Sequence, residues 1–163
     1  MTSREPVLKQ HVPQARLLSD DDTISLVLKA AGREFPEVHE YWDGNWMMIH
    51  LVFTMPGVQI DFIDPCIRTD ELEDFLEELK SFSQEHVLGI ETDFTEPILY
   101  LNMQVVEPGS DVVATQVEIN ILAEKAQAGM TVEMDVTMEA VEEFIRGIEE
   151  ILREYPVVDR ETH

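Results

Sequence analysis

The feature that most constrains the fold is a pair of neighbouring segments in which apolar and polar positions alternate. Residues 45–54 are the stronger of the two, and one side of this segment is fully apolar: Met47, Ile49, Leu51 and Phe53. Residues 58–63 alternate in the same way, and the turn-forming Met55-Pro56-Gly57 separates the two segments. Alternation with a period of two is typical of a half-buried strand. We therefore predict a β-hairpin over residues 45–63.

Two later segments have the spacing of amphipathic helices instead. The first begins at Thr69, a residue type that caps helix N-termini, and ends near His86. The second begins at Thr137 and ends before Pro156, which cannot continue a helix. Each has apolar residues at intervals of three and four positions: Leu72, Phe75, Leu76, Leu79 and Phe82 in the first, and Val141, Phe144, Ile145, Ile148, Leu152 and Tyr155 in the second.

The remaining alternating segments set the expected fold class. They lie at residues 15–18, 23–30, 88–94, 98–106, 112–122 and 130–136. Residues 32–44 and 127–129 are expected in loops or turns. Runs of strands with helices between them are typical of α+β folds and not of βαβ units. We therefore predict an α+β fold in the order strands–helix–strands–helix, with an antiparallel, strongly twisted β-sheet of about seven or eight strands and two amphipathic helices.

The length of the chain and a similarity between its helices bear on domain organisation. With 163 residues, the chain is long enough for one buried core. We expect a flexible N-terminal arm at residues 1–13, a single α+β domain at 14–158 and a C-terminal tail at 159–163. Leu72-Glu73-Asp74-Phe75-Leu76 matches Val141-Glu142-Glu143-Phe144-Ile145 in residue type. A duplicated half-domain would explain this match, and so would the general likeness of acidic amphipathic helices.

The strong negative charge excludes several classes of function. The sequence has 34 acidic and 11 basic residues, a formal net charge of −23. Such a surface repels the phosphates of nucleic acids and the anionic inner leaflet of membranes, so we expect neither as a partner. No apolar run approaches the ~20 residues that a membrane-spanning helix needs. Residues 1–12 lack the apolar stretch of a secretory signal, so we expect the protein in the cytoplasm.

No arrangement of residues in the sequence requires catalysis. The five histidines do not form the spaced pairs of a zinc helix, and there is no phosphate-binding glycine loop. The single cysteine, Cys66, cannot form an internal disulfide and is expected to be a buried structural residue. We therefore predict no catalytic residue, no cofactor and no metal ligand, and we expect that the protein is not an enzyme. A metal-binding enzyme that uses the acidic loop around His39 and Asp43 remains a third interpretation.

Residues 41–46, Tyr41-Trp42-Asp43-Gly44-Asn45-Trp46, concentrate the aromatic side chains. They contain both tryptophans and one of the three tyrosines. One interpretation is structural, with a turn at Asp43-Gly44 and Trp46 anchoring the next strand in the core. The other is functional, because exposed Trp and Tyr side chains dominate many protein–protein interfaces. We expect Trp42 to be the exposed ring and Trp46 the buried one.

The acidic residues on the outer sides of the two predicted helices indicate a kind of partner. Opposite charge speeds association and helps to select a partner, so we predict a basic protein. A solvated surface, or a proteome adapted to salt, would also explain the excess of acid. The residues expected to contact the partner are Tyr41, Trp42, Asp43, Glu73, Asp74, Glu77, Glu142, Glu143 and Glu149.

Residues 43–46, Asp-Gly-Asn-Trp, lead into an apolar strand and resemble the aspartate-x-asparagine-tryptophan signature of the WapI-type bacterial immunity protein family. Residues 68–75 (Arg-Thr-Asp-Glu-Leu-Glu-Asp-Phe) and 155–157 (Tyr-Pro-Val) also look like that family, and the order of elements is similar over roughly residues 20–158. The resemblance implies an α+β protein that neutralises a toxin, the C-terminal domain of a large secreted, wall-associated bacterial protein. In the type example this domain attacks transfer RNA. Immunity proteins have no catalytic residues, so the resemblance implies none here.

Two hypotheses of different classes follow. The first is a non-catalytic cytoplasmic binding protein, an immunity protein that neutralises a basic toxin, such as a nuclease, by covering its active site. The second is a self-associating structural or scaffold domain. In that homodimer a long apolar strand, such as residues 45–54, would pair across the edge of a sheet.

Overall fold

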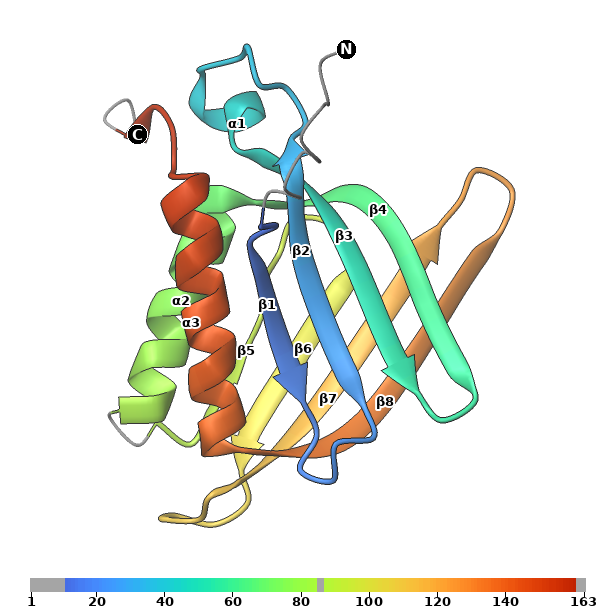
Figure 1. Ribbon diagram of the computed structural model, residues 1–163, viewed down its shortest axis with the longest axis vertical. Helices are drawn as coiled ribbons and strands as arrows, with labels where there is room; N and C mark the ends of the chain where they lie inside the picture. The colour runs from blue at the N-terminus through green and yellow to red at the C-terminus, as the bar shows by residue number, and fades with distance from the viewer. Residues whose placement is uncertain (1–10, 85–86, 161–163) are drawn as a thin grey trace, which may run out of the picture.

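A computed structural model of the chain describes residues 11–84 and 87–160 (Figure 1). The expected end of the first helix near His86 lies outside these residues, as do most of the expected N-terminal arm and part of the expected C-terminal tail. The elements of the described part are, in chain order, β1 (Gln14–Leu18), β2 (Ser25–Arg33), α1 (Tyr41–Gly44), β3 (Trp46–Met55), β4 (Val58–Arg68), α2 (Thr69–Gln84), β5 (Gly89–Glu91), β6 (Leu99–Val105), β7 (Val112–Leu122), β8 (Gln127–Thr137) and α3 (Met138–Glu154).

The strands pair antiparallel and form two four-stranded sheets, β1-β2-β3-β4 and β5-β6-β7-β8. The α+β class and the order strands–helix–strands–helix are confirmed. The strands divide between two sheets because α2 follows β4, and β5 then begins a second sheet behind the first (Figure 1). Alternation shows which side of a strand is buried, whereas the neighbours of a strand depend on tertiary contacts.

The predicted hairpin is confirmed and is longer than expected. β3 pairs with β4 from Met55 and Val58 at the turn to Trp46 and Arg68 at the other end. Gly57 in the turn has a φ of 81°, a left-handed conformation that glycine adopts without steric cost. The apolar side of β3 is buried, as the alternation predicts. β3 pairs with β2 on its other edge, so the expectation that this strand pairs across a dimer edge is wrong.

Two other segments differ from the prediction. Residues 41–44 form the short helix α1 within an expected loop. Residues 127–129, expected in a turn, begin β8, and the turn lies at 123–126, where the Ala123 N–H donates to the Ala126 carbonyl (3.0 Å). Pairing with β7 along the whole length of β8 outweighs the local turn preference of this glycine-containing stretch.

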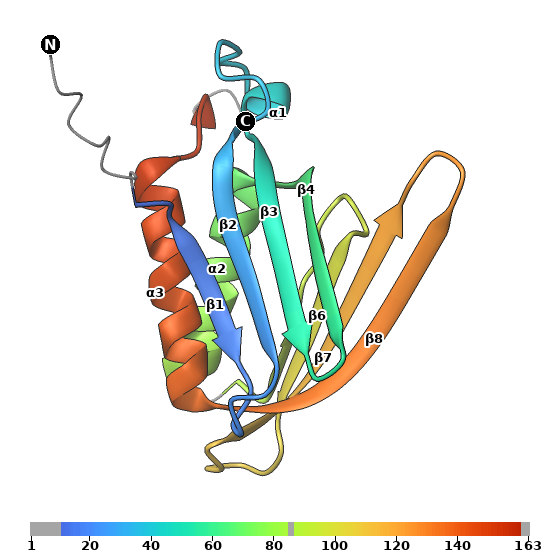
Figure 2. The ribbon, with the colours of Figure 1, turned by 45° about the vertical axis from the view of Figure 1, so that its right-hand side comes forward.

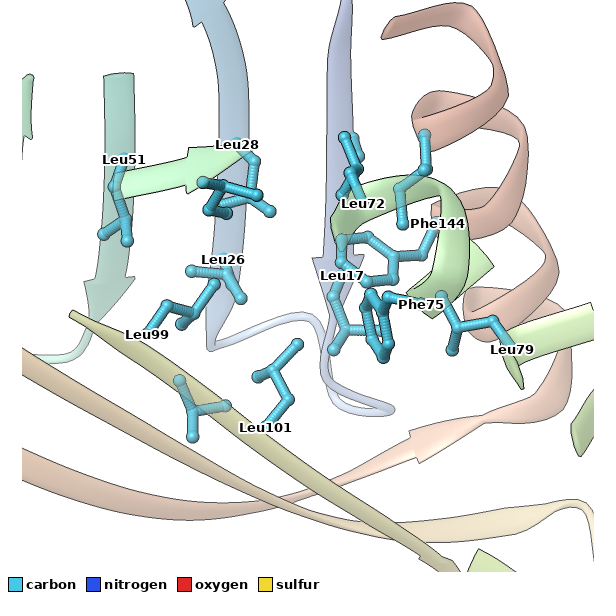
Figure 3. Packing of buried hydrophobic residues seen from close by; sticks show 14 of the residues in the cluster. Leu17, Leu26, Leu28, Leu51, Leu72, Phe75, Leu79, Leu99, Leu101 and Phe144 are labelled. Atoms are coloured by element: carbon cyan, nitrogen blue, oxygen red, sulfur yellow. The ribbon is translucent and has the colours of Figure 1, made fainter. Parts of the chain in front are cut away.

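The inner sides of both sheets and the apolar sides of α2 and α3 belong to one core (Figures 1 and 2). α3 packs along β1 and against α2, so the two helices cover one side of the sandwich. In Figure 3, leucines of β2 and β3 lie across from Leu99 and Leu101 of β6. Phe75 of α2 meets Phe144 of α3 edge to face, with ring centroids 6.4 Å apart.

Apart from the short helix α1 between β2 and β3, the two halves of the chain have the same order of elements. Strands β1–β4 are followed by α2, and strands β5–β8 are followed by α3. The shared helix pattern falls at equivalent places, and its two phenylalanines, Phe75 and Phe144, are the residues that meet. This equivalence favours the duplicated half-domain over a chance likeness of two helices.

Candidate partner-binding site

The aromatic segment lies at one end of the sandwich, where α1, the start of α2 and the segment after α3 meet (Figures 1 and 2). Asn45 holds these three parts together and is completely buried. Its Nδ2 donates to the carbonyls of Tyr41 (2.7 Å) and Val158 (3.2 Å). Its Oδ1 accepts from the Thr69 hydroxyl (2.8 Å) and from the Val158 N–H (2.9 Å). Every polar atom of this buried amide is therefore used, and Asn45 is a structural residue of the signature.

The residues beside Asn45 fit the same tight junction. A Cβ atom on Gly44 would lie 2.7 Å from the Val38 carbonyl oxygen and 2.9 Å from the Val158 Cγ2, so only glycine fits there. Arg33 binds the junction from the first sheet, because its guanidinium donates to the carbonyls of Gly44 (3.1 Å) and Pro156. Burial lowers the pKa of Arg33 from its ordinary value. The local fold of residues 41–46 thus depends on contacts with residues far along the chain.

Arg68, at the end of β4, organises the aromatic rings. Its side chain is 1% exposed, and its guanidinium carbon lies 3.7 Å from the Trp42 ring centroid, 5.2 Å from that of Tyr41 and 5.7 Å from that of Trp46. The guanidinium also donates to Asp70 Oδ1 (2.9 Å) and to the Tyr41 carbonyl (3.0 Å). This buried charge is therefore both paired and stacked, which offsets the cost of removing it from water.

Sequence reasoning did not single out Arg68. The signal was present, because Arg68 is the only lysine or arginine between Glu34 and Leu79. What the sequence does not reveal is that one cation lies against three rings from residues 41–46, since the two segments are about twenty residues apart and meet only when β3 and β4 pair.

Trp42 is the exposed ring, as predicted, with 62% of its surface accessible. Trp46 is half-buried and lies against Arg68, so the expectation of a core anchor is wrong. We call Tyr41, Trp42 and Asp43, with the Arg68 beneath them, the Trp42 platform. One face of the Trp42 ring packs on the Arg68 guanidinium, which fixes the orientation of the ring and of its exposed face.

Acidic groups surround the Trp42 platform. A shallow hollow beside it is lined by Glu40, Tyr41, Trp42 and Asp159. The Tyr41 hydroxyl donates to Asp70 Oδ2 (3.0 Å). The pKa of Asp74 is raised, first by burial and then by the neighbouring carboxylates of Asp70, Glu73 and Glu77. The platform therefore presents an aromatic ring within a field of negative charge.

The other predicted contact residues lie on the helices and fall into two groups. Glu73 and Glu149 are ion-paired, with Arg160 (2.7 Å) and Lys80 (3.6 Å), and with Glu77 they line a groove between α2 and α3. Glu142 and Glu143 are exposed on α3, about two turns before Glu149. The structure thus brings Asp74 close to the Trp42 platform, places three acids in the α2–α3 groove, and leaves two on the outer side of α3.

The remaining reactive groups have structural surroundings. Cys66 is buried, as predicted, and burial together with the charge of Asp64 raises its pKa to about 12, so the thiol stays protonated at neutral pH. Within residues 11–84 and 87–160, no group of three or more His, Cys, Asp or Glu side chains could hold a metal ion. His39, in the acidic loop, is exposed. No helix among the described residues is both long and apolar enough to cross a membrane.

Comparison with known protein families matches residues 16–156 to the WapI-like family of immunity proteins. Comparisons with curated proteins and with solved structures find no match. The matched span contains both sheets, both long helices, the Asn45 junction and Arg68. It also covers the signature on which the sequence resemblance rests, residues 43–46. The chain belongs to the WapI-like immunity protein family.

Proposed function

We propose that this protein is a non-catalytic, cytoplasmic immunity protein that neutralises a basic bacterial toxin by covering the toxin's active site. The observation that carries the proposal is an exposed tryptophan held on a buried arginine and surrounded by carboxylates. Tryptophan is among the residues that contribute most to protein–protein binding. The exposed ring of Trp42 is therefore the part of the surface best suited to anchor a protein partner.

The geometry of Trp42 supports tight binding. The ring packs 3.7 Å from the Arg68 guanidinium carbon, and Arg68 is itself fixed by Asp70 and by the Tyr41 carbonyl. A side chain that is already ordered loses little further conformational entropy when a partner binds. The Trp42 platform therefore has the character of a preformed anchor.

The charge of the molecule supports a basic partner. With a formal charge of −23, the protein attracts a basic toxin over a distance of about one Debye length, ~8 Å at physiological ionic strength. An enzyme that acts on nucleic acid has a basic active-site surface, and carboxylates substitute there for phosphates. The proposed contact surface combines the Trp42 platform with the helix acids Glu73, Asp74, Glu77, Glu142, Glu143 and Glu149. Glu73 and Glu149 must exchange Arg160 and Lys80 for a partner, so we expect them to contribute least.

Growth rescue tests the proposal directly. A candidate toxin domain, the C-terminal domain of a large polypeptide encoded beside an immunity gene of this kind, is expressed in cells with the wild-type protein, with Trp42→Ala, or alone. We expect the domain alone to stop growth, the wild type to restore growth, and Trp42→Ala to weaken binding of the purified domain at least tenfold, as loss of a central aromatic anchor does.

Leu122→Ala is the matched control, because Leu122 is also a large exposed side chain (48% accessible) and lies at the far tip of the β7–β8 hairpin. It should rescue like the wild type. A toxic domain that the wild-type protein neither binds nor neutralises would contradict the immunity function. Equal binding by the wild type and by Trp42→Ala would leave that function standing and remove the platform from the contact surface.

A further inference from the structure

The outer face of the second sheet carries a wide hollow that the contact residues named above do not include. α2 borders it on one side, and β5, β6 and β7 form its floor. Among the residues that the structure describes, its lining contains four carboxylates, Glu78, Glu91, Asp93 and Glu118, and no lysine, arginine or histidine. An adjoining hollow over β6, β7 and β8 adds Glu133 and Asp135, and its described lining contains no basic residue.

The equivalent face of the first sheet shows that this bias is not a general property of the fold. There Arg16 on β1, Lys29 on β2 and His50 on β3 accompany the acids, and His50 pairs with Asp61 at 2.5 Å. On designed solvated surfaces both signs of charge are interspersed, as they are on this face of the first sheet. Since the two halves have the same order of elements, the all-acidic face of the second sheet is specific to that half.

The polar side chains in the hollow are ordered before any partner arrives. The Tyr100 hydroxyl donates to Glu91, Asn102 donates to the Tyr100 oxygen (3.2 Å), and Gln104 donates to Asn102 (3.2 Å). On the next strand Asn120 donates to Glu118 (3.3 Å). A carboxylate accepts about four hydrogen bonds, so Glu91 and Glu118 have capacity for an ammonium or guanidinium group. The hydrogen bond to Glu91 also raises the pKa of Tyr100, which keeps this hydroxyl a neutral donor at the centre of the hollow.

One side of α2 connects the hollow to the Trp42 platform. Asp74 and Glu78 are four residues apart and therefore lie on the same side of this helix. Glu78 lines the hollow, and the charge of Asp74 acts on Tyr41 of the platform. The opposite side of α2 meets the groove where Lys80, Arg153 and Arg160 reduce the negative charge. A basic surface seated on Trp42 is thus drawn toward the second sheet.

We infer that this hollow binds a lysine- and arginine-rich segment of the toxin, so that the contact surface runs from Trp42 along Asp74 and Glu78 to Glu91 and Glu118. The inference rests on the proposed function, because it names the surface on which that basic partner is held. Charge complementarity and the continuity with the platform select a basic protein segment as the occupant.

The test compares two double variants with equal loss of charge. Glu91→Gln with Glu118→Gln neutralises the hollow while keeping an acceptor oxygen for Tyr100 and Asn120. Glu107→Gln with Glu154→Gln removes two exposed acids elsewhere, at the β6–β7 turn and at the end of α3. Binding of each full-length protein to the toxin domain, inactivated by substitution, is measured by calorimetry at low and at high salt. We expect the hollow variant to bind at least tenfold more weakly at low salt, with a flatter salt dependence, and the control to stay within threefold of the wild type.

Asp93→Asn is a second hollow variant, because Asp93 is exposed and we expect its replacement to leave the fold undisturbed. Its affinity should fall in the same direction. If both hollow variants bind like the control while Trp42→Ala weakens binding, the hollow is not part of the contact surface and the immunity function is unaffected. If the wild type does not bind the toxin domain, both proposals are wrong.

Discussion

Asn45 illustrates how much of the candidate site depends on single residues. Its side chain makes four hydrogen bonds, to Tyr41, Thr69 and both backbone groups of Val158. Thr69 was predicted as a helix cap, but its hydroxyl donates to Asn45 instead. Thr137, the residue at which the second helix is predicted to begin, is itself the cap of α3 and accepts from the Ala140 N–H (3.1 Å). The same residue type has two roles because only the first is next to a buried amide.

The partly buried carboxylate of Glu71 is expected to make the free energy of unfolding depend on pH. Its Oε2 accepts from the Thr95 N–H (2.9 Å), whereas its Oε1 is buried and has no hydrogen-bond partner among the described residues. Burial is the main cause of a raised pKa for Glu71. Because the folded pKa lies above the unfolded value, ionised Glu71 lowers stability at neutral pH, and the wild type regains this stability as the pH falls through the folded pKa.

Glu71→Gln keeps the acceptor for Thr95 and removes the charge. We expect its free energy of unfolding at pH 7 to exceed that of the wild type by about 1 kcal/mol, and the difference to vanish below pH ~4.3, the ordinary pKa of glutamate. Urea unfolding from pH 7 to pH 4 measures this. Glu77→Gln, an exposed neighbour on α2, should change stability by less than ~0.5 kcal/mol. A Glu71→Gln variant that is less stable than the wild type at pH 7 would show that contacts other than the Thr95 N–H stabilise the ionised carboxylate.

At the scale of elements, the packing of α3 on β1 depends on a glycine in the middle of the helix. Gly147 is buried, and a Cβ atom there would lie 2.5 Å from both the Ala15 Cα and the Gln14 carbonyl oxygen. The helix backbone therefore touches the strand backbone. Sequence periodicity identified the apolar side of this helix correctly. It could not show that the helix packs on β1, because this contact depends on which strand forms the edge of the first sheet.

Gly147→Ala tests this contact. In an exposed helix the change would stabilise by about 0.5–1 kcal/mol. Here we expect a loss of about 1–3 kcal/mol in the free energy of unfolding, because the added methyl group forces α3 away from β1. Arg146→Ala, an exposed change on the same helix, should have little effect in the same chemical denaturation experiment. Equal or greater stability of Gly147→Ala would mean that α3 does not approach β1 this closely.

At the scale of the whole molecule, the two halves repeat one plan but do not have separate cores. Residues from both sheets and both long helices form one apolar cluster, and Phe75 of the first half contacts Phe144 of the second. Neither half can bury its apolar face without the other. The two halves therefore depend on each other for stability.

Cooperative unfolding is the expected result of this shared core. Trp42 and Trp46 lie in the first half, so their fluorescence reports on that half, whereas circular dichroism reports on both. We expect the two signals to follow one urea transition with the same midpoint, as for a two-state domain. Separate midpoints would contradict the single domain predicted for residues 14–158.

Features that repeat over short distances along the chain could be predicted from the sequence. Alternation identified the buried side of β3, and helical spacing identified the apolar sides of α2 and α3. Residues 43–46 indicated the family. Each of these signals is local. Side chains alternate between the two faces of any strand and recur about every 3.6 residues on one side of any helix, wherever that element lies in the fold.

Three features arise only in the folded molecule: the division into two sheets, the cluster of aromatic rings around Arg68 and the all-acidic face of the second sheet. These features join residues that are far apart in the chain, and no local period encodes which strands become neighbours or which acids share a surface. The physical reason is that local sequence favours many strand pairings about equally. The pairing that forms is the one in which both sheets and both long helices bury their apolar sides in one core.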